Sequence, residues 1–336
     1  MRYFFALVMM FSFAGPVKAQ DPHFSQFFAS PLTLNPGYTG KFDGSFRVAG
    51  NYRNQWPTIN NAFTTATASV DFPILTNRLP ENDLWGVGIM GLNDRSGNKI
   101  LNNNFLTLST AYHKGLDENG YHQLTVGFQG TLANKRLDIS RADFQDELTA
   151  LGFTGVTQEI FTNQQVVVDY FDFNAGVMYY GTTNGMNNFY AGVSIYHVNR
   201  PGESFKGGNF TLEPRVTLHG GGYIPVGQFK TLHGSFLHQR QAGAMETVVG
   251  GAMAFNVNYS ETDPVEVYAG LWYRFNDALI PYVGLDVAGI RLGFSYDINN
   301  SSLNTASNSR GGTEISLIYV RRPSDPNLRK LNCPKF

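Results

Sequence analysis

The chain has 336 residues, of which 15% are charged and 14% aromatic, and its formal net charge is -1. An average soluble protein carries roughly 25% charged residues, and a near-neutral chain gives no electrostatic reason to expect nucleic acid as a partner. A composition poor in charge and rich in Phe, Tyr and Gly is typical of antiparallel strands with one apolar and one polar face.

Residues 1–19 have the features of a cleavable export signal. Arg2 supplies the positive charge, and the apolar stretch from Tyr3 to Gly15 is too short to span a bilayer as a helix. Val17 and Ala19 are small residues at the cleavage positions, so we expect cleavage after Ala19, with an uncleaved membrane anchor as the alternative. Cys333 is the only cysteine, which excludes an intrachain disulfide.

Residues 20–43 form a segment rich in aromatic residues that comes before the first predicted strand. No stretch after the signal approaches the roughly 18 consecutive apolar residues that a transmembrane helix needs. An exported chain without such a helix is either periplasmic or an outer-membrane barrel. In a barrel, we expect residues 20–43 to plug the lumen or to pack at the periplasmic rim.

Residues 44–320 alternate apolar and polar side chains in segments of about ten residues, which is the pattern of barrel strands. In one such segment Val265, Val267 and Ala269 alternate with Glu266 and Tyr268. We predict strands near 44–54, 62–73, 84–95, 103–114, 122–138, 171–182, 188–198, 214–225, 231–241, 246–260, 265–275, 278–287, 290–297 and 312–320. The sequence therefore predicts an all-β fold, a transmembrane antiparallel up-and-down β-barrel of about 14 strands, with residues 321–336 as a periplasmic tail.

The predicted connections alternate between short inner turns and long outer loops, as in outer-membrane barrels. The inner turns include 117–120, 183–185 and 287–289, and the long outer loops are 139–169, 199–213 and 298–311. Aromatic side chains in the outer loops are candidate contacts for an extracellular partner: Phe144, Phe153, Phe161, Phe205 and Phe210. The alternative is that these loops only fold over the barrel mouth.

Inward positions of the predicted strands carry small residues and a set of polar or charged side chains. The polar set is Arg47, Asn51, Arg53, Arg215, His219, Arg274, Asp286, Arg291 and Glu314. Because buried charges need partners, these residues either pair with one another and close the lumen or contact a translocating or docked polypeptide.

Three patterns that could indicate chemistry fit barrel strands better. Gly86–Gly91 matches G-x-G-x-x-G, but no helix follows it. His219–Gly222 resembles a lipase oxyanion loop, although the chain has no G-x-S-x-G motif. His233 and His238 fall on opposite faces of a strand, so they cannot bind one metal. A Ser-His phospholipase on the barrel wall is the remaining catalytic alternative; we expect neither an enzyme nor a cofactor.

Several stretches resemble one known family. Gln20-Asp21-Pro22-His23-Phe24-Ser25-Gln26-Phe27-Phe28, followed by Pro31-Leu32-Thr33-Leu34-Asn35-Pro36-Gly37-Tyr38-Thr39-Gly40, resembles the opening of PorP/SprF proteins. Later stretches are similar to further family motifs: Arg53-Asn54-Gln55-Trp56, Asn93-Asp94, Tyr296-Asp297 and Glu314-Ile315-Ser316-Leu317. Cys333-Pro334-Lys335-Phe336 is similar to the ending of SprF-like members.

The resemblance implies an outer-membrane protein of Bacteroidota that serves type IX secretion and gliding motility, without catalysis or a cofactor. SprF-like members, which the ending favours, assist export or surface attachment of a large adhesin. PorP-like members link the outer membrane to the periplasmic PorK/PorN ring. A pore for small solutes is the alternative from another class.

The motif residues are candidate partner-binding residues. They are Asp21, Phe24, Gln26, Phe27, Asn35, Pro36, Arg53, Gln55 and Trp56. We expect Asn35, Pro36 and their neighbours to form a docking surface for periplasmic partners, unless the segment only caps the barrel for stability.

Overall fold

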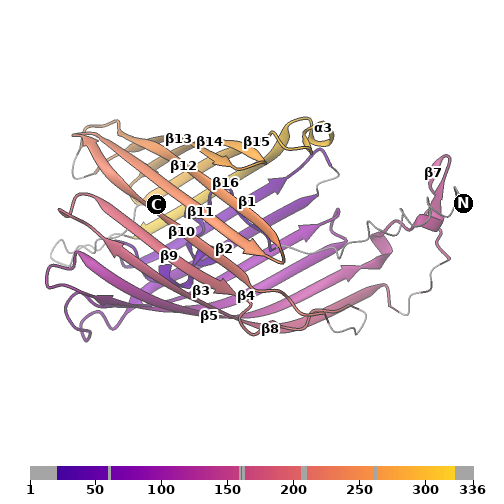
Figure 1. Ribbon diagram of the computed structural model, residues 1–336, viewed down its shortest axis with the longest axis horizontal. Coiled ribbons are helices and arrows are strands. Elements are labelled where there is room, and N and C mark those ends of the chain that lie inside the picture. The colour runs from indigo at the N-terminus through magenta and orange to yellow at the C-terminus, as the bar shows by residue number, and fades with distance from the viewer. Residues whose placement is uncertain are drawn as a thin grey trace, which may run out of the picture.

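The computed structural model describes residues 21–59, 62–158, 160, 163–205, 210–260 and 263–321. Over these residues fourteen antiparallel strands form one closed barrel, in which β1 pairs with β16 (Figure 1). The wall strands are β1 (Phe46–Gln55), β2 (Phe63–Ile74), β3 (Leu84–Ser96), β4 (Leu101–Gly115), β5 (His122–Asp138), β8 (Gln165–Gly181), β9 (Asn188–Tyr196), β10 (Arg215–Gly227), β11 (Lys230–Gln241), β12 (Ala244–Asn256), β13 (Glu266–Arg274), β14 (Ala278–Val287), β15 (Ile290–Asn299) and β16 (Arg310–Arg321). The predicted all-β up-and-down barrel is confirmed. The predicted signal peptide and residues 322–336 lie outside the described residues.

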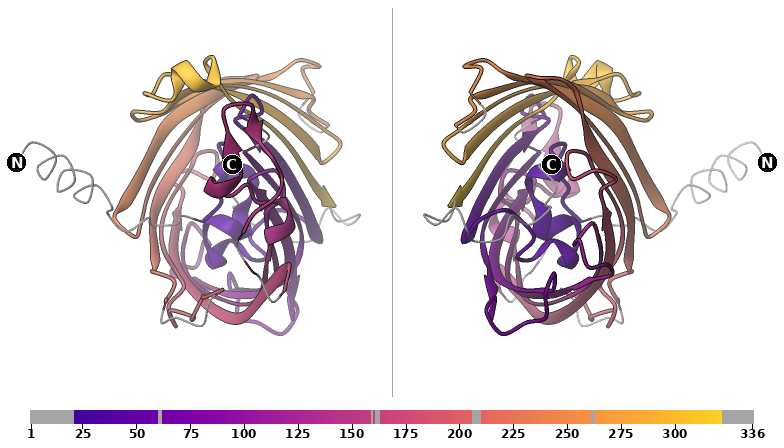
Figure 2. Two further views of the ribbon diagram at one scale, coloured as in Figure 1. Left: turned by 90° about the vertical axis from the view of Figure 1, so that its right-hand side faces the viewer. Right: turned by 90° about the vertical axis from the view of Figure 1, so that its left-hand side faces the viewer.

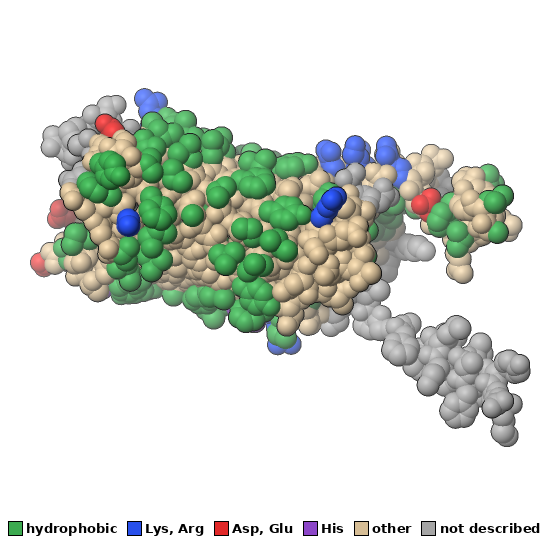
Figure 3. Space-filling model, turned by 90° about the horizontal axis from the view of Figure 1, so that it is seen from above, with side chains coloured by type: hydrophobic (Ala, Val, Ile, Leu, Met, Phe, Trp, Pro, Cys, Tyr) green, Lys and Arg blue, Asp and Glu red, His purple; other side chains and the backbone are tan. Residues whose placement is uncertain are grey.

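The strands alternate between a buried lumenal face and an exposed outer face. β9 shows the alternation at every position, with buried residues such as Tyr190 between exposed ones such as Val193. Figure 3 shows hydrophobic side chains across the middle of the outer wall and charged side chains mainly toward its two ends. This distribution is the one expected of a barrel whose middle faces lipid.

The two ends of the barrel differ. β1 begins and β16 ends at what we call the terminal end, and residues 139–164 and 197–214 connect strands at the opposite, loop end. The loop of 139–164 contains the short turns η3 (Ile139–Arg141) and η4 (Gln145–Glu147) and the paired strands β6 (Leu148–Thr149) and β7 (Gly152–Phe153), a hairpin that projects away from the wall (Figure 1). The loop between β15 and β16 contains α3 (Asn304–Ser307).

Two expectations about the connections are corrected. β8 begins at Gln165, because β5 and β8 continue to pair as far as Asp138 and Gln165, which shortens the predicted loop. The alternation of short and long connections also fails between β11 and β12. There Ala242 and Gly243, both with positive φ, make a tight turn at the loop end, as two-residue hairpins require.

Residues 21–43 lie inside the ring of strands, and we call them the plug (Figure 2). The plug contains the short helical turns η1 (Phe27–Ala29), α2 (Pro31–Leu34) and η2 (Pro36–Tyr38). It enters near the loop end and reaches β1 at the terminal end. Among the residues that the structure describes, no helix is both long and apolar enough to cross a membrane.

The hydrophobic core of the protein lies between the plug and the lumenal wall. The Phe28 ring lies 4.8 Å from the Trp272 ring and 5.5 Å from the Tyr282 ring, measured between centroids. Phe27 packs edge-on against Phe28. Aromatic contacts of this kind stabilise by about 0.5–1.5 kcal/mol beyond their buried area, so the core fixes the plug as well as the barrel.

Candidate functional site in the barrel lumen

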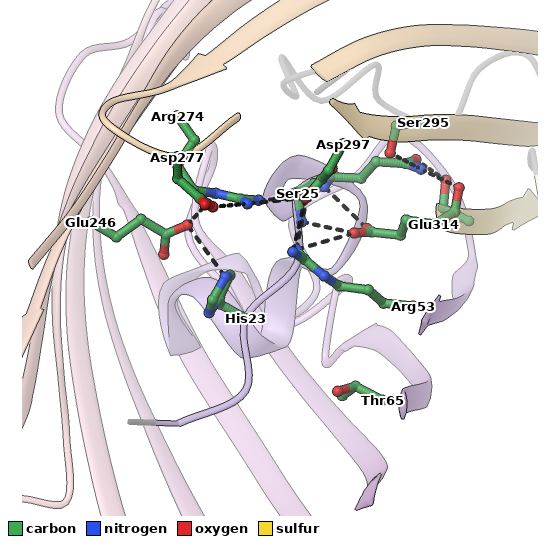
Figure 4. A network of polar contacts seen from close by, with 12 residues as sticks. His23, Ser25, Arg53, Thr65, Glu246, Arg274, Asp277, Ser295, Asp297 and Glu314 are labelled. Carbon is green, nitrogen blue, oxygen red and sulfur yellow. Dashed lines mark hydrogen bonds and ion pairs between the residues drawn. The ribbon is translucent and has the colours of Figure 1, made fainter. Parts of the chain in front are cut away.

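A buried polar network attaches the plug to the wall near the loop end (Figure 4). The Ser25 amide donates to Glu314 Oε2 at 2.7 Å, and the Gln26 amide donates to Glu314 Oε1 at 3.0 Å. The Ser25 hydroxyl donates to Asp297 Oδ1 at 2.8 Å. One plug turn thus binds carboxylates on both β15 and β16.

Two arginines complete this network. Arg53 on β1 donates to the Ser25 hydroxyl at 2.7 Å and to Asp297 at 2.9 Å. Arg274 on β13 donates to the same hydroxyl at 2.6 Å and to Asp297 at 3.0 Å. All of these side chains are almost fully buried. Removing one partner of a buried ion pair leaves an uncompensated charge and typically costs about 3–5 kcal/mol.

A second cluster holds the beginning of the plug at the loop end. His197 contacts the Asp21 carboxylate at 2.6 Å and the Asp172 carboxylate at 2.9 Å. The Asp21 amide donates to Gln241 at 2.8 Å, and Arg215 lies 3.6 Å from the Asp21 carboxylate. Burial would lower the pKa of His197, but the carboxylates of Asp21 and Asp172 outweigh it and raise this pKa to about 9. His197 is therefore charged at neutral pH.

Side chains of the wall also bind backbone carbonyls in the middle of the plug. Gln129 on β5 donates to the Leu32 carbonyl at 2.9 Å, and Ser194 on β9 donates to the Leu34 carbonyl at 2.8 Å. His113 on β4 contacts the Thr39 carbonyl at 2.9 Å. These bonds come from strands on the side of the barrel away from β15 and β16, so the plug is held across the lumen.

Asn35 and Tyr38 pack against the lumenal face of β8, β9 and β10. Asn35 Nδ2 is 3.0 Å from His219 Nε2, and Asn35 Oδ1 accepts a hydrogen bond from the Gly37 amide at 2.8 Å. The Tyr38 ring stacks on the His219 ring with centroids 5.5 Å apart. His219 therefore serves as a packing and hydrogen-bonding partner of the plug.

An ion pair between two wall residues, Arg47 on β1 and Asp71 on β2, holds the terminal end of the plug. Arg47 Nη2 donates to Asp71 Oδ2 at 2.7 Å and to the Tyr38 carbonyl at 3.0 Å. The Gly40 amide donates to Asp71 at 2.7 Å. The plug thus has polar attachments at both of its ends.

Of the other lumen residues singled out in the sequence, Asn51 is buried, and Arg291 pairs with Asp286 at 2.7 Å. Among the described residues, no group of three or more His, Cys, Asp or Glu side chains could hold a metal ion. Gly86–Gly91 lies within β3, and His233 is buried while His238 faces outward.

Most of the candidate partner-binding residues lie inside the barrel and not on an exposed docking surface. Asp21 is partly buried, and Phe24, Gln26, Phe27, Asn35, Pro36 and Arg53 are buried in the lumen. Gln55 and Trp56 are partly buried at the loop end. Asn35 and Pro36 thus form no exposed surface at the periplasmic rim, because the lumen encloses them; a partner reaches them only if the plug leaves the barrel.

The loop aromatics differ in exposure. Phe153 is 54% exposed and Phe210 49% exposed, whereas Phe144 and Phe205 are partly buried. Phe161 lies outside the described residues. Leu151, at the tip of the β6–β7 hairpin, is fully exposed, so the projecting hairpin presents apolar side chains to the surroundings of the loop end.

A comparison with protein families identifies the family of this chain. The family described as type IX secretion system membrane protein PorP/SprF matches residues 17–319. The chain belongs to the PorP/SprF family. Family and fold together indicate a membrane component of type IX secretion in the bacterial outer membrane.

Other comparisons concern more distant proteins. No curated protein matches the chain in sequence. Solved structures with a similar fold include a Pseudomonas aeruginosa FadL homologue (TM-score 0.47, 9% identity, 87% of this chain and 94% of that chain covered). A further example is the Pseudomonas putida toluene transporter TodX, with a TM-score of 0.49, 9% identity, and 90% of this chain and 94% of that chain covered. Another is the Ralstonia pickettii toluene transporter TbuX, with a TM-score of 0.49, 9% identity, and 86% of this chain and 92% of that chain covered.

Four of the stretches that resemble PorP/SprF motifs contribute residues to the Ser25 network in the lumen. Ser25 and Gln26 come from the opening stretch, Arg53 from the R-x-Q-W stretch, Asp297 from the Y-D pair and Glu314 from the E-I-x-L stretch. Ser25 and Asp297 were not among the candidate residues, although both lie within these stretches. His197 and Asp172 lie outside the motifs, and no signal in the sequence pointed to them.

Proposed function

We propose that this PorP/SprF protein is a plugged, non-catalytic barrel that assists export or surface anchoring of a large adhesin-type substrate. The observation that supports this proposal is the plug, which is tied to wall strands all around the lumen. A pore for small solutes needs an open lumen. The buried aromatic core and the Ser25 network argue against that alternative.

The position of the motif residues also favours a partner at the cell surface over a periplasmic ring. The opening stretch is enclosed by the barrel, and exposed apolar side chains project at the loop end. In outer-membrane barrels the longer loops face the outside. We therefore propose the β6–β7 hairpin, with Leu148, Leu151 and Phe153, as the surface that contacts the secreted substrate.

The test is to tag the protein at its native level, extract it in mild detergent and identify what co-purifies. We expect a large secreted adhesin. Recovery of periplasmic ring proteins without an adhesin would instead support the core linking role. Recovery of the protein alone, together with ion conductance in planar bilayers, would support the solute pore.

A variant pair locates the contact. The loop variant replaces Leu148, Leu151 and Phe153 with Ser, and the control replaces the exposed Leu116, Met186 and Val257 at the terminal end with Ser. We expect the loop variant to lose about tenfold or more of the captured adhesin, because a few apolar contacts dominate most interfaces. If the control loses the adhesin and the loop variant keeps it, the partner binds at the periplasmic side.

A further inference from the structure

The outer faces of β3, β4 and β5 carry chemically distinct rows at successive heights. Nearest the loop end, Arg95 on β3 lies opposite Asn102 on β4 in the strand register, and Asn102 lies opposite Arg136 on β5. One row further from the loop end, Asn93 lies opposite Asn104, and Asn104 lies opposite Asn134. The row below contains Leu106 and Leu132, which are paired neighbours and are both exposed. Along β5 the outer face thus changes from apolar to amide to basic within four residues, from Leu132 to Arg136.

The basic row forms one side of a cavity of about 290 Å³. Arg95, Lys99, Asn102, Arg136, Asp138, Arg141 and Gln165 line this cavity. Arg141 binds Asp138 at 3.1 Å. In the part of the chain that the structure describes, Arg95, Lys99 and Arg136 have no acidic partner within ion-pair distance. Four cations thus share one carboxylate, and the cavity has an excess of positive charge.

A second depression, of about 540 Å³, lies next to this cavity on the same strands. Leu106 and Leu132 contribute apolar surface to it, and Asn104, Asn134 and Asp169 contribute polar groups. Asn134 donates to Asp169 at 2.6 Å, which directs that carboxylate toward the amide row. A ligand that fills both depressions has an apolar part, a hydrogen-bonding middle and an anionic end.

The heights of the rows fit a bilayer. On the outer face of β5 the exposed apolar residues run from Leu124 to Leu132. These eight residue steps measure about 26 Å along the strand. A strand tilt of about 40° reduces this length to a height of about 20 Å, which is most of the apolar band of about 25 Å in outer-membrane barrels. The amide and basic rows therefore lie just beyond the hydrocarbon region, at the level of lipid headgroups at the loop end.

We propose that this basic cluster binds the phosphate groups of an outer-leaflet glycolipid of the lipopolysaccharide type. Acyl chains would pack on Leu106 and Leu132, sugar hydroxyls would meet the asparagine row, and Arg95, Lys99 and Arg136 would bind phosphate. Arginine binds phosphate through two parallel hydrogen bonds. The cluster faces away from the lumen beside the lipid belt, which favours a lipid over an acidic polypeptide.

The experiment uses the full-length mature protein refolded in detergent and native mass spectrometry. The probes are bisphosphorylated lipid A, lipid A with its phosphates removed, and inorganic phosphate. The test variant carries R95Q, K99Q and R136Q. The matched control carries R200Q, R240Q and R310Q, which remove the same charge from exposed positions elsewhere at the loop end. Heat-modifiable gel mobility verifies that both variants fold.

We expect bisphosphorylated lipid A to bind the parent and the control equally, and the test variant about tenfold or more weakly, since each basic residue near anionic lipid adds to its binding. Removing the phosphates from lipid A should weaken its binding to the parent by a similar factor. Equal binding by the parent and the test variant would overturn the proposal. So would equal affinity for lipid A with and without phosphate, or for lipid A and inorganic phosphate. A loss of adhesin capture with unchanged lipid A binding would assign the cluster to an acidic polypeptide instead.

Discussion

At the scale of residues, glycines of the wall allow the plug backbone to approach the strands closely. A methyl group at Gly127 on β5 would lie 2.5 Å from the Gly37 nitrogen of the plug. At Gly86 on β3 it would lie 2.7 Å from the Gly40 α-carbon. Both contacts are with backbone atoms, which cannot rotate away as a flexible side chain can. Gly127 and Gly86 thus leave the space that the plug backbone occupies.

We expect G127A to destabilise the protein by about 1–3 kcal/mol, because a methyl group added to a packed interior forces the backbone to shift. The outward-facing Gly91 on β3 is the matched control, since a methyl group there meets nothing within 4 Å. Urea unfolding in lipid vesicles measures both variants. Equal free energies of unfolding for G127A and G91A would mean that the plug shifts to accommodate the methyl group without a loss of stability.

At the scale of elements, the plug is a segment held mainly by tertiary contacts. Its helical turns have three or four residues each, and helices of that length have almost no stability of their own in water. The polar networks around Ser25, Asp21 and Arg47 and the aromatic contacts of Phe28 therefore fix its position. Disrupting the Ser25 network should release the loop-end part of the plug first, because the Arg47 attachment lies at the other end.

A double variant, R53A and R274A, tests this dependence. Both arginines bind the Ser25 hydroxyl, so their loss leaves Asp297 and Glu314 buried without their cations and should displace residues 21–30. We expect ion conductance in planar bilayers from this variant and little from the parent. R291A is the control, because Arg291 pairs with Asp286 within the wall. If the double variant folds but conducts ions as little as R291A does, the network does not keep the lumen closed.

At the scale of the whole molecule, the path of the plug gives the barrel a polarity. Asp21 contacts His197 at the loop end, while β1 begins at the opposite end. The chain therefore crosses the length of the lumen before its first strand forms part of the wall. If the loop end faces the cell exterior, Asp21 and the beginning of the plug lie near the cell surface.

Cysteine labelling tests this orientation in a Cys333→Ser background. T149C lies in the exposed hairpin at the loop end, and E118C lies in an exposed turn at the terminal end. We expect a membrane-impermeant maleimide to label T149C on intact cells, and to label E118C only after the outer membrane is permeabilised. The reverse pattern would place the hairpin and the basic cluster in the periplasm and remove the basis for the glycolipid site.

Most of the strands, their approximate number and the face of the wall on which their side chains lie could be predicted from the sequence. These features depend on local alternation, because side chains of a strand point to opposite faces and lipid requires one of them to be apolar. The same alternation identified Arg53, Arg274 and Glu314 as inward residues before any of their partners was known.

Which residues meet, and whether the plug lies in the lumen or at a rim, could be seen only in the folded barrel. Ser25 and Glu314 are 289 residues apart, and closure of the barrel brings them together. The sequence left open whether the segment with Asn35 and Pro36 plugs the lumen or packs at the rim, because an aromatic segment outside the strands can be buried equally well in either place. The volume inside fourteen strands and the glycines that face it favour the lumen. These properties belong to the closed barrel, and no local pattern of residues contains them.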